Sequence, residues 1–248
     1  LGVVACITPW NFPAAIPVWK IAPALVSGNT VVFKPATLTP ETASAVVSIF
    51  ERAGLPKGVL NLILGSGSAV GNAILDHDAV RAVSFTGSNE VGAGIYARGA
   101  ARMIRVQAEM GGKNPVIVMA DADLDLAVES TATGAFGSTG QRCTATSRVI
   151  VDAQIADAFV ERLAARARKV RVGNGLEGAE MGPAVDQSQL DTDLRYIEVA
   201  RGEGARLVTG GRRLTEGGLD HGYFVEPTVF DGVTTAMRIA QEEVFGPL

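Results

Sequence analysis

The sequence has little of what several large classes of protein require. Only two of its 248 residues are cysteine, too few for a disulfide framework, and neither has neighbours at metal-ligand spacing. No apolar run reaches the roughly 18 residues that a membrane span needs. The chain also does not open with a basic, then apolar, then small-residue leader. These absences predict a soluble protein of a reducing compartment such as the cytoplasm, with no metal site and no membrane partner.

Charge of either sign is also modest, which argues against another class of partner. The 22 Lys and Arg are outnumbered by 26 Asp and Glu, giving a net charge of −4 at pH 7, and charged residues make up 19% of the chain. Proteins that bind nucleic acid through its phosphates concentrate positive charge. We therefore expect no nucleic-acid partner.

The chain instead alternates short apolar runs with amphipathic segments. Hydrophobic residues make up 47% of it, enough for the core of one large domain or two modest ones. Short runs rich in branched residues predict strands buried on both faces of a parallel sheet. These runs are 31–34, 59–64, 80–85 and 116–119.

Two amphipathic segments predict helices. One begins after Thr39, which can cap it, and ends before Gly54; the other covers about 153–170. Repeating strand–helix units of this kind predict an α/β fold with doubly wound, mostly parallel sheets. The glycine-rich stretches near 92–99 and 202–218 are interpreted as turns and surface loops.

The two ends of the sequence carry an expectation of their own. It begins inside an apolar run at Leu1, without an initiator Met, and stops at Leu248 without a terminal helix. Because termini usually lie in polar segments that fray, we interpret the chain as an internal segment of a longer protein. A natural domain with tight termini is the alternative.

One glycine-rich motif is a weak indicator of function. The segment 65–71 follows a predicted strand and opens a helix, like a dinucleotide-binding fingerprint. Its spacing is one residue too long, and no acidic residue follows at the right distance within a strand. A tight strand-to-helix turn explains it equally well, so we do not place a pyrophosphate there.

Four other segments place chemically useful side chains in turns. Asn11 lies between two prolines, Glu109 precedes two glycines, and Cys143 follows a glycine-rich turn; Glu243 and Phe245 lie near the end. In this order, and together with Lys34-Pro35-Ala36 and Phe85-Thr86-Gly87-Ser88, these segments resemble the signature segments of the aldehyde dehydrogenase superfamily. The resemblance covers essentially the whole chain.

The resemblance implies a set of catalytic residues. Cys143 would be the nucleophile, since a thiolate converts the aldehyde into a tetrahedral adduct that can release hydride. Asn11 and the backbone N–H of Cys143 would stabilise the oxyanion. Glu109 would activate water to hydrolyse the thioester, and Lys20 would help to relay its protons. A buried structural cysteine is the alternative for Cys143, and it is our reading of Cys6.

Cofactor residues are implied in the same way. Lys34 resembles the lysine that contacts the adenosine ribose, and Gly87 and Ser88 resemble the turn that contacts the pyrophosphate. Glu243 resembles the acid that holds the nicotinamide ribose, and Phe245 the aromatic residue beside the nicotinamide.

Two departures from the family pattern bear on specificity. Thr37 stands where many members have Glu, whose carboxylate repels a 2′-phosphate, so we expect NADP to be accepted, up to a preference over NAD. Equal use of both cofactors is the alternative. Arg142 precedes the nucleophile, and its guanidinium suits a carboxylate or phosphate. An arginine turned away from the substrate is the alternative.

The run 140–148 looks most like the α-ketoglutaric semialdehyde dehydrogenases. Succinic or glutaric semialdehyde and non-phosphorylating glyceraldehyde-3-phosphate oxidation are alternatives, all with small, anionic aldehydes as substrates. Acyl transfer to coenzyme A, reduction of an acyl phosphate and a truncated non-enzymatic relative also remain open, although Glu109 favours hydrolysis.

The resemblance further implies two domains and an oligomer. Residues 1–110 would form part of a Rossmann-like NAD(P)-binding domain, and 111–248 part of an α/β catalytic domain. Both would be truncated relative to the family. The full-length protein would be a homodimer or a homotetramer.

Overall fold

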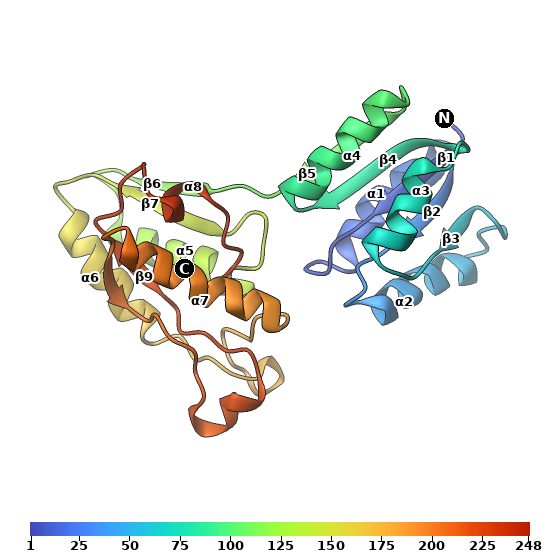
Figure 1. Ribbon diagram of the computed structural model, residues 1–248. Helices are drawn as coiled ribbons and strands as arrows, with labels where there is room; N and C mark the ends of the chain where they lie inside the picture. The colour runs from blue at the N-terminus through green and yellow to red at the C-terminus, as the bar shows by residue number, and fades with distance from the viewer. The chain divides into compact units, whose positions relative to one another are not determined.

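The computed structural model describes residues 1–248, and their contacts divide into two compact units, Leu1–Gly111 and Gly112–Leu248 (Figure 1). Each unit has its own sheets and its own hydrophobic cores. No helix in either unit is long and apolar enough to cross a membrane.

The first unit is built on a sheet of five parallel strands in the order β3-β2-β1-β4-β5. Its strands are Val3–Ile7 (β1), Thr30–Lys34 (β2), Leu60–Leu62 (β3), Val80–Gly87 (β4) and Arg105–Met110 (β5). Because all five run the same way, their carboxyl ends meet at one edge of the sheet.

Helices cover both faces of this sheet (Figure 1). Its helices are Ala15–Val26 (α1), Pro40–Arg52 (α2), Asn72–Asp76 (α3) and Asn89–Ala101 (α4), with a π-helical turn, Gly67–Gly71, leading into α3. One core joins Phe33 of β2 to Ile21 of α1 and Ala43 of α2. The other joins Phe85 of β4 to Leu75 and Ile95. The predicted doubly wound α/β fold is therefore confirmed.

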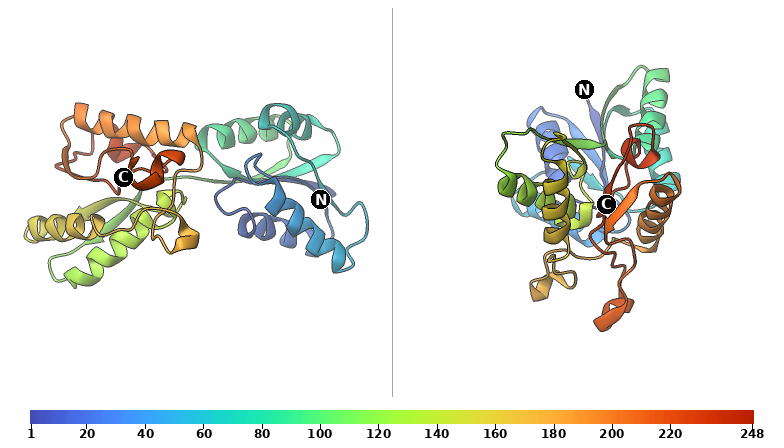
Figure 2. Two further views of the ribbon diagram at one scale, coloured as in Figure 1. Left: turned by 90° about the horizontal axis from the view of Figure 1, so that it is seen from below. Right: turned by 90° about the vertical axis from the view of Figure 1, so that its left-hand side faces the viewer.

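The second unit contains two short sheets. The parallel pair is Asn114–Val118 (β6) and Thr146–Val151 (β7), and the antiparallel pair is Arg206–Thr209 (β8) and Val229–Asp231 (β9). Its helices are Leu124–Phe136 (α5), Ala156–Ala167 (α6), Gln187–Gly202 (α7) and Arg238–Gln241 (α8), with 3₁₀ turns at Gly137–Gly140, Gly175–Glu177 and Glu216–His221. Figure 2 shows α5 and α6 on one side of β6 and β7 and α7 on the other.

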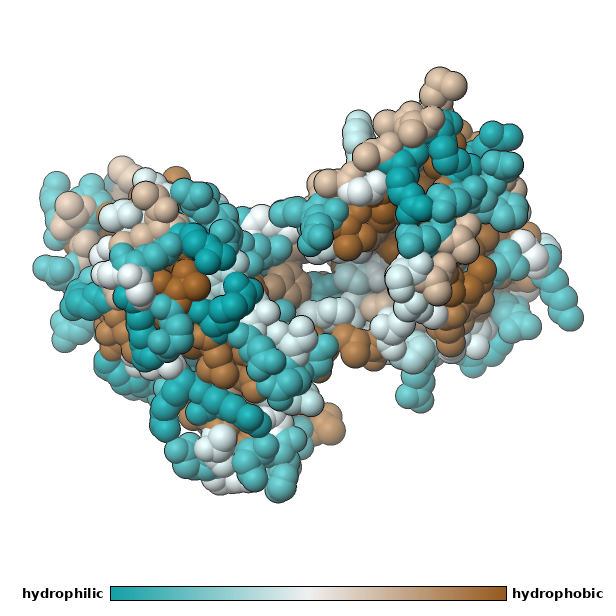
Figure 3. Space-filling view, viewed as in Figure 1, coloured by the Kyte–Doolittle hydropathy of each residue, from teal (hydrophilic) through white to brown (hydrophobic).

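Apolar burial explains why these elements form where they do. Val118, Phe159 and Leu163 are buried in the core between β6, β7, α5 and α6. Both units also expose apolar surface (brown in Figure 3), and the exposed large side chains include Trp19 on α1 and Ile150 on β7.

The predicted strands and helices are present, with small shifts of their ends. The runs 31–34, 59–64, 80–85 and 116–119 lie on β2, β3, β4 and β6, and the two predicted helices are α2 and α6. The expected cap was wrong: Thr39 precedes α2, but its hydroxyl makes no capping hydrogen bond. With φ −131° and ψ 47°, its backbone lies outside the extended conformation typical of a capping residue.

The glycine-rich stretch 92–99 was wrongly read as a turn, because it forms the middle of α4. A side chain at Gly92 would collide with Met110, and one at Gly99 would collide with Val106. These glycines therefore let the helix lie close against β5, which outweighs their low helix propensity. The stretch 202–218 is only partly loop, since β8 lies within it.

A buried carboxyl group supports the last segment of the chain. Asp193 of α7 is fully buried, and its Oδ1 accepts a hydrogen bond of 2.8 Å from Gln189. The same Gln189 amide donates to the carbonyl of Val244 at 3.0 Å. A side chain at Gly246 would collide with Asp193, whose Oδ2 has no hydrogen-bond partner. Burial raises the pKa of Asp193 from 3.8 to about 7.

Replacing Asp193 with Asn should remove part of the pH dependence of stability. Because the folded pKa is raised from 3.8 to about 7, the wild-type free energy of unfolding should fall between those two values and then level off. At about pH 8 the variant should be more stable than the wild type by on the order of 3 kcal/mol. At about pH 4 the two should be nearly equal. Urea unfolding at both pH values measures this.

Asp191→Asn is the matched control, because Asp191 is exposed on the same helix. It removes one carboxylate without touching the buried one. An equal gain at both pH values for Asp193→Asn would contradict the prediction.

Candidate functional site

The carboxyl edge of the five-stranded sheet gathers the residues that the sequence singles out in the first unit. Asn11 lies in the loop after β1, Lys34 ends β2, and Gly87 ends β4. Glu109 lies at the end of β5. The strand order reverses between β1 and β4, and such a switch point is where open α/β sheets bind ligands.

A cavity of about 380 Å³ opens beside this switch point, between α3 and α4. Its wall includes the π-helical turn before α3, the apolar face of α4 and the end of β2. The lining residues are Ile7, Lys34, Gly67, Ser68, Gly71, Asn72, Leu75, Val91, Gly94, Ile95 and Arg98. A lysine within a mostly apolar lining suits a ligand with a flat apolar part and a negatively charged or polar part.

Lys34 and Thr37 differ in how they are held. Lys34 is buried, and its ammonium donates to the carbonyl of Pro35 at 2.9 Å. Burial lowers its pKa. Thr37 lies in the exposed connection between β2 and α2. No side-chain carboxylate accepts a hydrogen bond from Lys34, so its charge is available to a bound anion.

The turn from β4 into α4 has the local structure of an anion site. Ser88 caps α4, its hydroxyl accepting from the N–H of Val91 at 3.4 Å. A side chain at Gly87 would collide with the ring of Phe85, so backbone alone fits there. The free N–H groups at such a helix start attract phosphate oxygens.

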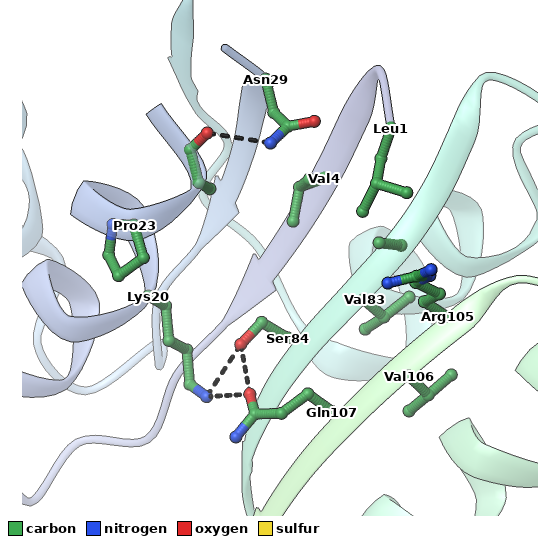
Figure 4. Close-up of a pocket in the computed structure, with 12 residues that line it drawn as sticks. Leu1, Val4, Lys20, Pro23, Asn29, Val83, Ser84, Arg105, Val106 and Gln107 are labelled. Atoms are coloured by element: carbon green, nitrogen blue, oxygen red, sulfur yellow. Dashed lines mark hydrogen bonds between the residues drawn. The ribbon is translucent and has the colours of Figure 1, made fainter. Parts of the chain in front are cut away.

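Lys20 lies beneath this edge, on α1, where it borders a second cavity of about 480 Å³ (Figure 4). Its ammonium donates to Ser84 at 3.1 Å, to the carbonyl of Phe85 at 3.0 Å and to Gln107 at 3.2 Å. Burial lowers the pKa of Lys20, an effect that the nearby Cys6 and Glu109 oppose.

Glu109 and Lys20 are linked through an intermediary that the sequence did not indicate. The amide nitrogen of Gln107 donates to Glu109 Oε1 at 2.8 Å, while its oxygen accepts from Lys20. Gln107 and Glu109 lie two residues apart on β5 and therefore on the same face. Lys20 thus holds Gln107, and Gln107 in turn orients the exposed carboxylate of Glu109.

In the second unit, Cys143 lies in a tightly constrained turn, which we call the Cys143 turn (residues 137–145). Cys143 itself is half-buried. Ser138, Thr139 and Gly140 all have positive φ, at 54°, 59° and 67°, an uncommon conformation for the first two. Thr139 donates to the carbonyl of Gly182 at 3.0 Å.

Gln141 and Arg142 tie the Cys143 turn to two further segments. Gln141 accepts from the N–H of Val185 at 2.8 Å. Arg142 Nη2 donates to the carbonyls of Thr133 and Gly134, at 3.1 and 2.9 Å, at the end of α5. Arg142 Nε is buried and has no hydrogen-bond partner. The guanidinium that the sequence assigned to substrate is therefore also a support for the helix before the turn.

The acidic segment 242–246 packs against the Cys143 turn. A side chain at Gly140 would collide with the carbonyl of Gly246, so the two backbones touch. Phe245, between the acids and Gly246, has a positive φ of 64°. The second unit therefore brings Cys143, Glu243 and Phe245 into one region.

The two acids of this segment have different environments. Glu242 accepts from Arg238 at 2.9 Å and from the hydroxyl of Tyr196 at 2.5 Å, and these bonds lower its pKa to about 2. Burial raises the pKa of Glu243, against a hydrogen bond from the N–H of Gly112 and the charge of Lys113. Glu242 is thus held by Arg238 and Tyr196, whereas Glu243 lies beside Gly112 and Lys113.

Lys113 is a residue whose position the sequence motif did not indicate. It lines the small gap between the Cys143 turn and the acidic segment. Burial and the charge of Arg148 lower its pKa to about 8, which Glu243 and Glu242 oppose.

Neither the second cysteine nor any cluster of acidic and histidine side chains adds a reactive site. Cys6 is fully buried in β1, as the sequence predicted, and burial raises its pKa to about 11. No group of three or more His, Cys, Asp or Glu side chains could hold a metal ion.

Sequence reasoning missed most of the cavity beside Lys34. From the sequence we placed no phosphate-binding site at segment 65–71, yet Gly67, Ser68 and Gly71 line that cavity. The signal was present, a glycine-rich turn after a strand, but its irregular spacing reflects a π-helical turn rather than the usual α-helical start.

Comparisons with known proteins agree with this arrangement. The chain is 55% identical to α-ketoglutaric semialdehyde dehydrogenase of Bacillus subtilis and 52% identical to 2,5-dioxopentanoate dehydrogenase of Saccharolobus solfataricus. Both matches cover all of this chain and 51% and 52% of the relative. The chain therefore spans about half the length of the curated relatives it matches.

A solved structure gives the same result. Betaine aldehyde dehydrogenase from Staphylococcus aureus in complex with NAD⁺ superposes with a TM-score of 0.97 at 44% identity, over 99% of this chain and 49% of that one. The sequence profile described as "Aldehyde dehydrogenase family" matches residues 1–248. Because this profile covers every residue and the relatives are 44–55% identical over 99% or more of the chain, the chain belongs to the aldehyde dehydrogenase family.

Proposed function

We propose that the protein oxidises an aldehyde to the carboxylic acid with NAD or NADP, and that α-ketoglutaric semialdehyde is its substrate. The observation that carries the proposal is the Cys143 turn, in which a half-buried thiol is flanked by residues bonded to separate segments. Identities of 55% and 52% to relatives named for α-ketoglutaric semialdehyde and 2,5-dioxopentanoate support it.

The residues of the first unit fit the adenosine and phosphate parts of a dinucleotide. The cavity between α3 and α4 has apolar walls for a flat base and Lys34 for a ribose or phosphate oxygen. Gly87 and Ser88 offer backbone N–H groups at a helix start. We assign residues 1–110 to cofactor binding and 111–248 to catalysis, with Glu243 and Phe245 toward the nicotinamide ribose. When bound, NAD or NADP would supply the hydride acceptor.

Cys143 is the proposed nucleophile. Its thiolate adds to the aldehyde carbon, so that a C–S bond forms and the carbonyl oxygen becomes an oxyanion. The backbone N–H of Cys143 and the amide of Asn11 are the proposed donors to that oxyanion, each worth about 3 kcal/mol. Loss of hydride from the adduct leaves a thioester on Cys143.

Glu109 is the proposed general base for hydrolysis of this thioester. It would take a proton from water, whose oxygen attacks the acyl carbon, and the C–S bond breaks to release the acid and the thiolate. Gln107 orients Glu109 through a 2.8 Å hydrogen bond, and Lys20 holds Gln107. Lys20 therefore supports the base without touching it directly.

Replacing Cys143 or Glu109 tests the reaction on the full-length protein. Cys143→Ser should lower turnover of α-ketoglutaric semialdehyde by a factor on the order of 10⁴. Glu109→Gln should still give one equivalent of reduced cofactor in a burst and then stall, because the thioester is no longer hydrolysed. Absorbance of the reduced cofactor follows both. A Cys143→Ser protein that turns over at the wild-type rate would refute the proposal.

The exposed position of Thr37 predicts the choice of cofactor. Thr37→Glu should lower kcat/KM for NADP by about 10- to 100-fold relative to NAD, because a carboxylate near the 2′-phosphate repels it even after solvent screening. Thr37→Ser, which adds no charge, is the control. Steady-state kinetics with both cofactors measure the ratio, and an unchanged ratio would remove Thr37 from the cofactor site.

The two uses of Arg142 can be separated by comparing substrates. If its guanidinium recognises the substrate carboxylate, Arg142→Ala should raise KM for the acidic aldehyde by about 10-fold or more, and leave a neutral aldehyde of equal length nearly unchanged. If Arg142 serves only the carbonyls of Thr133 and Gly134, kinetics on both aldehydes should change alike and the Tm should fall.

A further inference from the structure

We propose that Asn114 is the positioning residue of the Cys143 turn, and that its side-chain amide fixes the peptide groups on the carboxyl side of the nucleophile. This inference rests on the proposed function, in which Cys143 attacks the aldehyde. It adds a residue whose role no motif of the family resemblance assigned.

The side-chain amide of Asn114 contacts two carbonyls at the end of the Cys143 turn. Its Nδ2 donates to the carbonyl of Cys143 at 2.7 Å and to the carbonyl of Ala145 at 3.0 Å. A side-chain amide has two N–H donors, and both are used here. The N–H of Ala145 in turn donates to the carbonyl of Arg142 at 3.0 Å, which closes the chain into a β-turn with Cys143 inside it.

A carbonyl inside such a turn has no partner from the turn itself. The closing bond uses the carbonyl of Arg142 and not that of Cys143, and an unpaired peptide oxygen in a half-buried site is unfavourable. Asn114 supplies the missing donor. Its bond orients the peptide plane that follows Cys143, and so restricts ψ of the residue that carries the thiol.

Asn114 is itself held in place, so it can fix the position of the Cys143 turn. It begins β6, where Pro115 restricts its backbone to the extended region. Its N–H donates to the hydroxyl of Ser147 at 3.1 Å, and that hydroxyl donates to the carbonyl of Ala145 at 3.3 Å. The register of β6 with β7 places Asn114 opposite Thr146. The amide therefore projects from a fixed strand end.

The consequence is that two proposed catalytic groups move as one. The thiol and the backbone N–H of Cys143 belong to the same residue, so a fixed turn sets the position of both groups relative to the rest of the second unit. A misplacement of about 1 Å can cost roughly 100-fold in rate. Asn114 contacts neither group and acts through the backbone.

The decisive variant is Asn114→Asp, which keeps the shape and removes both donors. A carboxylate would also repel the two carbonyl oxygens. We expect kcat for α-ketoglutaric semialdehyde to fall about 100-fold, with the Kd for the dinucleotide within about two-fold of the wild type. Asn114→Ser, with one shorter donor, should give a smaller loss of kcat.

A second measurement does not depend on turnover. The rate of Cys143 alkylation by iodoacetamide, read by peptide mass spectrometry under native conditions, should rise several-fold in Asn114→Asp because the half-buried thiol becomes more accessible. The fully buried Cys6 should stay unmodified in the same samples.

The matched control is Asn61→Asp. The Asn61 amide also donates to two backbone carbonyls, those of Val31 and Gly58, at 3.4 and 2.9 Å, but on β3 of the first unit. It should leave kcat and Cys143 alkylation unchanged. Unchanged kcat and alkylation in Asn114→Asp would overturn the inference. A wild-type protein without aldehyde oxidation would instead refute the proposed function, and the alkylation rates would still decide the role of Asn114.

Discussion

The arrangement of the second unit depends on a contact between two stretches of bare backbone. Gly140 of the Cys143 turn meets the carbonyl of Gly246, and Gly246 in turn leaves no room for a side chain beside Asp193. Any larger residue at either position would push the acidic segment away from the turn. The positive φ values of Ser138, Thr139 and Phe245 follow from this approach, because both chains must bend sharply to reach it. At Thr139, the hydrogen bond from the side-chain hydroxyl to the carbonyl of Gly182 helps to hold the bent backbone.

The fold could be predicted because its strands are short runs of apolar residues with branched side chains. Such runs form strands because the interior of a sheet buries them. Where packing and local preference disagree, prediction failed. Gly92 and Gly99 have the residue type typical of turns, yet both lie within α4. The helix forms because these glycines let it pack closely against β5. Thr39 has the right residue type for a cap, yet its backbone conformation takes the hydroxyl out of reach. Segment 65–71 breaks the expected spacing because a π-helical turn contains it.

Motifs indicated which side chains we propose for the chemistry, but not which residues hold them in place. Lys20 reaches Glu109 only through Gln107, a residue on another element 87 positions away in sequence from Lys20. Of two adjacent acids, Glu242 is bound by Arg238 and Tyr196, and this favours Glu243 as the acid proposed for the cofactor. Such partners come from distant parts of the chain, and one sequence without its fold gives no means to pair them.

The burial of Cys6 has a consequence for how the protein meets electrophiles. Desolvation within β1 keeps its thiol neutral, with a pKa raised to about 11, and no path leads a reagent to it while the sheet is intact. Toward a thiol-directed alkylating agent, the folded chain therefore presents one reactive thiol, that of the half-buried Cys143. If Cys143 is the nucleophile as proposed, alkylation of that one sulfur would abolish turnover, while Cys6 would stay protected inside β1.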